Sequence, residues 1–153
     1  LVDSARVGER LVQRLAQIGM HADEGRLIIK ELAGLSTQGP RSGVVVLGRF
    51  RPEPGYKSYI EKAREMGATY FNMPSSPGYD VWDALRIAGI DPWEVNKQFL
   101  DDAIVRGDKF FVEANIDEIL RDPKFANTYL RRELEYLLSK GYRIEGNWFV
   151  PGG

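Results

Sequence analysis

The chain has 153 residues, of which 43% are hydrophobic and 28% charged, a composition typical of a globular domain with one sizeable core. Cysteine is absent and His21 is the only histidine, which excludes disulfides, zinc thiolate sites, a thiol nucleophile and multi-histidine metal sites. The net charge of -1 argues against a protein that binds nucleic acid through its overall charge and leaves binding through a local basic patch as the alternative. Neither a membrane-spanning apolar run nor a signal peptide is visible, and from the start at Leu1 without Met we expect either a fragment of a longer polypeptide or a processed product.

The first 43 residues predict a helical arm followed by a linker. Apolar residues recur at helical spacing on both sides of a break at residues 19–23, which predicts a helical hairpin that ends at Ala33. Residues 34–43 are rich in Gly, Ser, Thr and Pro, the composition of a linker. We therefore divide the chain into an arm with its linker, residues 1–43, and a main domain, residues 44–153.

The main domain alternates between strand and helix patterns. The expected strands are residues 44–47, 69–73 and 109–114, with a closing hairpin of 142–145 and 148–150. The expected helices are residues 56–66, 81–88 and 92–106, with a last helix that starts at Asp122 and stops at Gly141. This alternation predicts an α/β fold in which helices are layered on a mixed sheet whose first strands are parallel.

The ends of the three expected parallel strands, where ligands usually bind in such folds, carry candidate site residues. The first strand is followed by Gly48, Arg49, Arg51 and Lys57, Asn72 lies near the end of the second, and the third ends at Glu113 and Asn115. Arg49, Arg51 and Lys57 make a basic loop before a helix, which favours phosphate binding through guanidinium forks and helix amides. The alternative is a solvated surface loop, since short charge clusters are usually exposed.

Two polar residues fall within apolar helical stripes. Asn96 lies among the apolar residues of its helix, which predicts a buried amide that either fixes packing through hydrogen bonds or orients a substrate. Glu133 lies between two leucines of its helix, which predicts either a general base or a carboxylate paired with Arg106 or Arg132. Sequence alone leaves both alternatives open.

Several segments resemble the C-terminal toxin domains of bacterial polymorphic toxins, including contact-dependent inhibition and Rhs-type effectors. The resemblance covers residues 44–150 and depends on residues 45–48, on GATYFNMP (67–74), on NKQFLDDAIVRGD (96–108) and on ELEYLLSKGY (133–142). None of these segments is a catalytic signature. The resemblance implies a domain that is delivered by a carrier polypeptide on its N-terminal side, acts in the target-cell cytoplasm and is neutralised by a cognate immunity protein.

The leading hypothesis is therefore a metal-independent ribonuclease that needs no cofactor and acts on RNA, with tRNA among the candidate substrates. The predicted catalytic residues are Arg49, Lys57, Asn96 and Glu133, and the predicted substrate-binding residues are Arg51, Asn72 and Asn115. In this hypothesis the two cations hold phosphate, and a carboxylate or amide directs the 2′-hydroxyl. The alternatives are a toxin that consumes NAD or another nucleotide, which needs a closed pocket, and an interaction module without catalysis.

Overall fold

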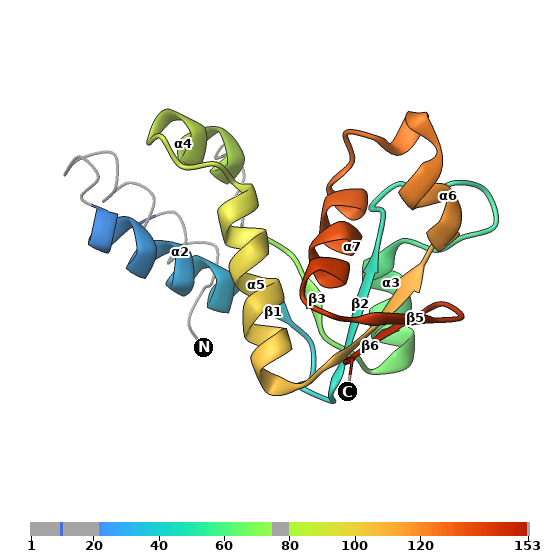
Figure 1. Cartoon of the computed structure of the whole chain (residues 1–153). Coiled ribbons are helices and arrows are strands. Elements are labelled where there is room, and N and C mark those ends of the chain that lie inside the picture. Colours follow the sequence, from blue (N-terminus) through green and yellow to red (C-terminus); the bar gives the residue numbers. More distant parts are fainter. Residues whose placement is uncertain (1–9, 11–21, 75–79, 153) are drawn as a thin grey trace. The chain divides into compact units, whose positions relative to one another are not determined.

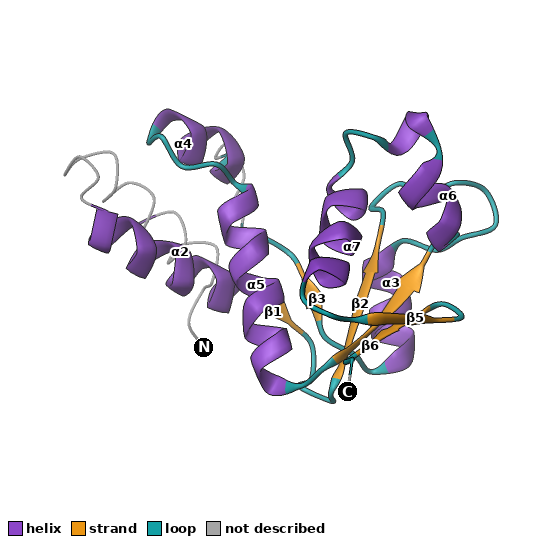
Figure 2. Cartoon of the chain, viewed as in Figure 1, coloured by secondary structure: helices purple, strands orange, loops and turns teal. Residues whose placement is uncertain are grey.

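A computed structural model of the protein describes residue 10, residues 22–74 and residues 80–152 (Figure 1). Helices and strands alternate along the chain (Figure 2), which confirms the predicted α/β fold with helices layered on a mixed sheet. The helices are α2 (Ala22–Ser36), α3 (Tyr59–Met66), α4 (Val81–Ile87), α5 (Trp93–Arg106), α6 (Ile116–Arg121), the 3₁₀ helix η1 (Pro123–Phe125) and α7 (Tyr129–Ser139). The strands are β1 (Thr37–Gln38), β2 (Val44–Gly48), β3 (Tyr70–Phe71), β4 (Lys109–Glu113), β5 (Arg143–Glu145) and β6 (Trp148–Val150).

The main sheet has four strands in the order β2, β4, β6, β5. β2 and β4 run parallel, and their carboxyl ends meet where Gly48 pairs with Glu113. Thr69 continues the parallel arrangement on the other side of β2, because its N–H donates to the Val44 carbonyl at 3.0 Å. The β5–β6 hairpin adds two antiparallel strands beside β4. The predicted closing hairpin and the parallel pairing of the first and third expected strands are confirmed, whereas β3, within the second expected strand, pairs with β1 in a separate two-stranded sheet.

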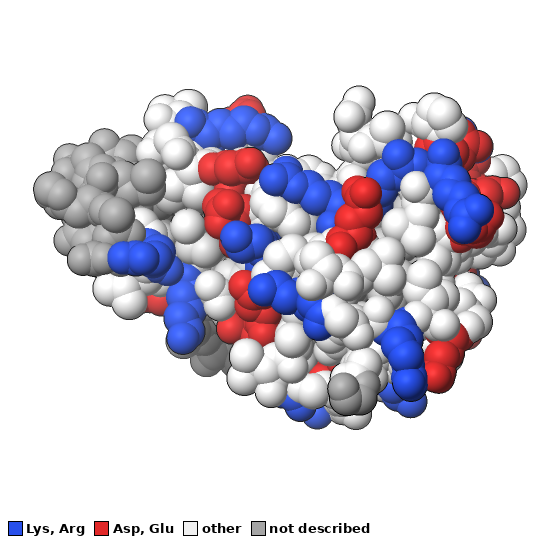
Figure 3. All heavy atoms as spheres, in the orientation of Figure 1, with Lys and Arg blue, Asp and Glu red and all other residues white. Residues whose placement is uncertain are grey.

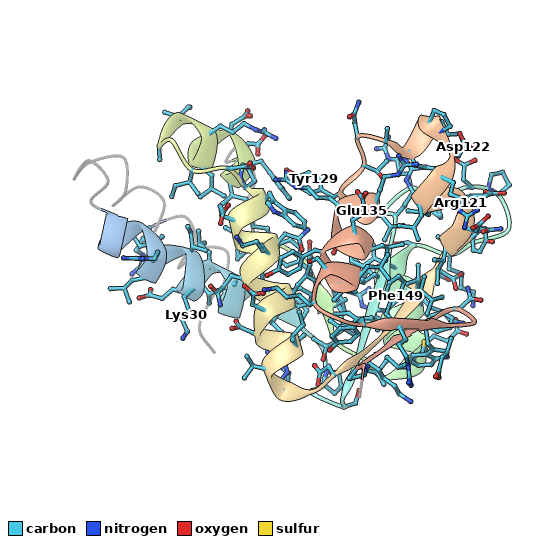
Figure 4. The ribbon with its side chains drawn as sticks, viewed as in Figure 1. Lys30, Arg121, Asp122, Tyr129, Glu135 and Phe149 are labelled. Atoms are coloured by element: carbon cyan, nitrogen blue, oxygen red, sulfur yellow. The ribbon has the colours of Figure 1, made fainter. Side chains whose placement is uncertain are left out.

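Helices cover the two faces of this sheet. Because successive strand residues point to opposite faces, Val44 and Val46 pack against α3 while Val45 and Leu47 face the other side. Figure 1 shows α3 behind the sheet and α7 in front of it. The residues of α7 that are buried are Leu130, Glu133, Leu134 and Leu137. Phe149, labelled in Figure 4, is fully buried in the strand beside β4 and completes the core.

The described chain forms two compact units. The first contains the described residues up to Gln38 together with Phe71–Phe99, and the second contains Gly39–Tyr70 and the described residues from Leu100 onward. In the first unit, the rings of Phe71 and Phe99 pack with centroids 5.2 Å apart. The second unit holds the four-stranded sheet with α3, α6 and α7. These boundaries lie at residues other than 43, where the sequence places the end of the arm.

The segment predicted as a linker is more ordered than its composition indicates. α2 continues through Gly34 to Ser36, because Leu32 and Ala33 are buried and the Ser36 hydroxyl donates to the Leu32 carbonyl at 2.6 Å. Gly39 packs so closely that a Cβ there would lie 2.4 Å from the Ala68 carbonyl oxygen. A linker over all of residues 34–43 is therefore wrong. The first half of the predicted helical hairpin lies outside the described residues.

The last helix begins later than predicted. Asp122 caps the short η1 helix, accepting the Lys124 N–H at 3.0 Å, and Thr128 is the N-cap of α7. The sequence prediction merged these elements and missed α6, whose N-cap is Asn115. Leu138 follows the buried Leu137 in this helix, and its exposed fraction is 39%. Among the described helices, none has the length and apolar character needed to cross a membrane.

Candidate functional site

The carboxyl edge of β2 and β4 is organised around Gly48. A Cβ at this position would lie 2.9 Å from the Tyr59 Cβ and 3.4 Å from the Glu113 carbonyl oxygen, closer than these neighbours allow without shifting. Tyr59 opens α3, with Ser58 as its N-cap. Glycine at the end of β2 thus lets the start of α3 approach the end of β4. The sequence predicted a site at the carboxyl ends of β2 and β4, and the absence of a side chain at Gly48 allows α3 and β4 to lie close together there.

Residues 49–57 form the loop between β2 and α3. Arg49 donates from Nη1 to the Glu53 carboxylate at 3.3 Å, and its guanidinium lies 5.3 Å from the centre of the Phe125 ring. Arg51 is exposed. This loop also exposes two aromatic side chains, with exposed fractions of 67% for Phe50 and 37% for Tyr56. The loop therefore alternates cationic and aromatic side chains at the surface.

Lys57 is the last residue of this loop, and its backbone N–H and its side-chain ammonium bind different partners. Its backbone N–H donates to the Glu113 carboxylate at 2.9 Å, which holds the loop against the end of β4. Its ammonium is paired with Glu65 on α3, and the hydrogen bond and charge of Glu65 raise the pKa of Lys57. The ammonium of Lys57 therefore binds Glu65 on α3, whereas its backbone N–H holds the loop against the carboxyl end of β4.

A narrow depression lies between this loop, the end of β4 and α6. It is lined by Arg49, Pro52, Glu53, Tyr56, Glu113, Ala114, Asn115, Glu118, Ile119 and Phe125. Its space accommodates a water molecule rather than a nucleotide. A wider, open groove shares Tyr56 and Asn115 with the depression and continues past α6 to the hairpin turn at Gly146 and Asn147. The described part of this edge is therefore an open groove with a small, mostly apolar recess, whose lining also includes Arg49 and Glu113.

Asn115 and Asn147 have structural partners within this groove. The Asn115 side chain accepts the Glu118 N–H at 3.2 Å and so caps α6. The Asn147 amide donates to the carbonyls of Val112 at 3.2 Å and Ala114 at 3.3 Å, tying the hairpin turn to the end of β4. Arg121 and Asp122, labelled in Figure 4, mark the far end of α6. The groove wall is consequently held by side-chain to backbone hydrogen bonds.

Glu133 lies on α7, with an exposed fraction of 7%. Burial raises the pKa of the Tyr59 hydroxyl, and the negative charge of Glu133 raises it further, which places the two groups near one another. Of the two arginines predicted as partners of Glu133, Arg106 pairs instead with Asp108, at 2.9 Å. Glu133 thus lies below the surface and outside the lining of the groove.

Asn72 and Asn96 belong to the first compact unit. Asn72 is exposed, and its backbone N–H donates to the Ser36 carbonyl at 2.8 Å. Asn96 is buried as predicted, with an exposed fraction of 4%. Its Oδ1 atom, however, has no hydrogen-bond partner, so the expectation of a satisfied amide is wrong for this atom.

The sequence prediction identified the basic side chains of the loop and overlooked its aromatic ones. Phe50 and Tyr56 alternate with Arg49, Arg51 and Lys57 in RFRPEPGYK, and this alternation was the available signal. Glu113 was placed at the edge without a role, yet the structure lines the depression with it. Figure 3 shows acidic and basic side chains interspersed over the face drawn, which agrees with the net charge of -1.

These features define an α/β domain whose parallel strands end at an open groove with cationic, aromatic and carboxylate side chains. In residues 22–74 and 80–152, no group of three or more His, Asp or Glu side chains is placed to hold a metal ion. No family model, curated protein or solved structure matches the chain.

Proposed function

We propose that this domain is an effector toxin that cleaves single-stranded regions of RNA without a metal. The observation that carries the proposal is the loop of residues 49–57, which exposes Phe50 and Tyr56 beside Arg49 at the rim of a recess containing Glu113. Delivery by a carrier polypeptide, action in the target-cell cytoplasm and an immunity protein as partner follow from the resemblance to polymorphic toxins and belong to the same proposal.

Exposed aromatic rings and arginines are the groups with which proteins bind single-stranded RNA. Bases stack on aromatic side chains, a contact worth about 1–3 kcal/mol per base, while arginines contact the phosphates. The open groove continues from Tyr56 along α6, and this shape suits an extended strand. An NAD-consuming enzyme needs a closed pocket. The described residues at this edge form an open groove, which favours RNA over NAD as the substrate.

The recess is too small for a nucleotide, so the RNA would lie at its rim, where the side chains that line it supply groups for transfer of the phosphoryl group to the neighbouring 2′-oxygen. In this reaction the Glu113 carboxylate takes the proton of the 2′-hydroxyl, and the 2′-oxygen attacks phosphorus. The bond to the 5′-oxygen breaks as a 2′,3′-cyclic phosphate forms, and the leaving oxygen takes a proton from solvent. Arg49 balances the charge on the phosphoryl oxygens. Among the acidic residues, Glu113 fits this role better than Glu133, because it lines the recess with Arg49 while Glu133 is buried elsewhere.

Induced expression of the domain in bacteria tests the proposal. We expect growth arrest with degraded RNA on a gel and an unchanged NAD content measured in the same culture. Glu113→Gln is expected to lower RNA cleavage by the purified domain about 10²- to 10⁴-fold, the usual contribution of a general base. Arg49→Ala with Lys57→Ala is expected to relieve toxicity. Arg64→Ala with Lys109→Ala, which removes an exposed arginine and an exposed lysine that line neither the recess nor the groove, is the matched control.

Three outcomes would contradict the proposal. Intact RNA with falling NAD would indicate the nucleotide-consuming alternative. Absence of any growth effect from a folded domain would indicate an interaction module. Full RNA cleavage by Glu113→Gln combined with loss of cleavage in Glu133→Gln would show that Glu133, and not Glu113, is the general base.

A further inference from the structure

Two cations and one carboxylate form a compact cluster at the rim of the recess. One oxygen of Glu53 lies 3.3 Å from Arg49 Nη1, and the other lies 3.9 Å from Lys124 Nζ. Both cations also contact the ring of Phe125, at 5.3 Å for the Arg49 guanidinium and 4.9 Å for the Lys124 ammonium. The buried Phe125 ring thus contacts two cations, and both cations also contact the carboxylate of Glu53.

The Phe125 ring gives the two cations a shared contact in addition to their shared anion. Phe125 is almost fully buried, with an exposed fraction of 2%, and the N-cap Asp122 fixes the η1 helix that carries both Lys124 and Phe125. Two like charges at one place are unfavourable unless an anion lies between them or a π-face stabilises them. The arrangement is therefore an anion site built from two elements that lie far apart in the sequence.

The Glu53 carboxylate is a weakly held occupant of that site. Each of its oxygens contacts a single cation at more than 3.2 Å, and the side chains of Arg49, Glu53 and Lys124 are 33%, 43% and 56% exposed. Exposed pairs of this kind contribute little to the stability of a protein. A phosphate group also presents two oxygens to two cations, and it carries more charge than a carboxylate.

We propose that Arg49 and Lys124 form a phosphate-binding site over Phe125, which Glu53 occupies as an internal competitor until a substrate phosphate displaces it. The site assigns a substrate-binding role to Lys124, which the sequence prediction did not select. Identification of the ligand as an RNA phosphate rests on the function proposed above. The two-cation site itself rests on the contacts of Glu53 and Phe125.

Displacement of Glu53 also changes the charge of the recess. With Glu53 in place, the lining contains three carboxylates, Glu53, Glu113 and Glu118, and one arginine. When a phosphate takes its position, the loop carboxylate moves away from both cations, and Arg49 and Lys124 then face the phosphate beside Glu113. The internal competitor therefore lowers affinity for weak anions and favours ligands with enough additional contacts, such as stacked bases, to displace it.

Binding of inorganic phosphate to the intact chain tests the site without reference to catalysis. NMR titration, followed at the Arg49 Nε–H and Phe125 ring signals, is expected to show tighter binding in Glu53→Gln by about two- to fivefold. Lys124→Gln is expected to weaken binding by a similar factor. Glu61→Gln removes an exposed acid on α3, and Lys109→Gln removes a lysine that lies 4.7 Å from a different ring, that of Trp148. Neither control is expected to change phosphate affinity.

The outcomes separate this inference from the proposed function. Equal tightening in Glu53→Gln and Glu61→Gln would mean that only overall charge matters and would overturn the site. Absence of phosphate-induced shifts at Arg49 and Phe125 in both wild type and Glu53→Gln would overturn it as well. Phosphate binding with the expected pattern but no cleavage of RNA by any variant would leave the site standing and remove the ribonuclease proposal.

Discussion

The two ends of the parallel strands use the same kinds of side chain in opposite ways. At the amino end of β4, two guanidinium nitrogens of Arg106 contact one oxygen of buried Asp108, at 2.9 and 3.0 Å. The Tyr142 hydroxyl donates to the Asp108 carbonyl at 2.7 Å, and burial, together with the charge of Asp108, raises the pKa of Tyr142. At the carboxyl end, Arg49 touches Glu53 through one nitrogen at 3.3 Å.

This comparison separates polar groups that hold the fold from polar groups that are available for exchange. A buried carboxylate with two short contacts loses much when its partner is removed, because the remaining charge is left without compensation. A half-exposed carboxylate with one long contact can be replaced by water or by another anion at little cost. The amino end is accordingly structural, and the carboxyl end is suited to binding.

The largest expected effect is at the structural end. Asp108→Ala is expected to lower the free energy of unfolding by about 1.5–3 kcal/mol, because it removes hydrogen bonds between charged groups at a buried position. Glu53→Ala at the opposite end is expected to change it by no more than about 0.5 kcal/mol. Urea melts of the two variants measure the difference. Equal losses in both would abolish the distinction between the two ends.

A smaller effect is expected at Asn96, a buried polar residue whose Oδ1 has no partner. Asn96→Leu keeps the size of the side chain and removes an acceptor that already lacks a donor, so stability is expected to change by less than about 1 kcal/mol. Thermal melts measure the stability change, and an RNA-cleavage assay on the same protein shows whether the amide serves the substrate. A loss above about 2 kcal/mol would show that the amide is structural after all.

The smallest effect is electrostatic and lies at the surface. Lys57 lowers the pKa of Glu65 by a hydrogen bond and by its charge. Lys57→Gln is therefore expected to raise the pKa of Glu65 toward its ordinary value, which a carbon-detected NMR titration measures. The stabilisation from this pair is complete above the ordinary carboxyl pKa and is lost as the pH falls through the lowered one. An unchanged Glu65 pKa would contradict the pairing, and Arg86→Gln serves as the control.

The sequence was sufficient to predict the fold where local signals agree with burial. The apolar strand of residues 44–47, the helix predicted at residues 81–88 and the closing hairpin of residues 142–145 and 148–150 each have strong local signals, and all three elements were confirmed. The start of α7 was missed because Asp122–Pro123 is a good helix start that here serves one turn of η1, before Thr128 restarts the helix. Caps mark where a helix begins without determining its length.

The candidate site was harder to predict from the sequence than the fold was. Strand order brings Glu113 opposite Gly48, and this pairing of residues far apart in the chain has no local signal. The partners of the cations were equally hidden: Lys57 pairs with Glu65, and Lys124 reaches Glu53 from η1. The sequence shows that Phe50 and Tyr56 lie among basic residues. Because large aromatic residues are usually buried, their exposure at the surface was seen only in the structure.

The outer strand of the main sheet has a consequence for the behaviour of the protein in concentrated solution. All three residues of β5 are exposed, and Arg143 and Glu145 form an ion pair along it at 3.0 Å. Short, charged outer strands resist pairing with strands of other molecules, because the charges would have to be desolvated. β5 therefore limits growth of the sheet by strand addition, so crowded copies of the domain are protected at this strand against aggregation.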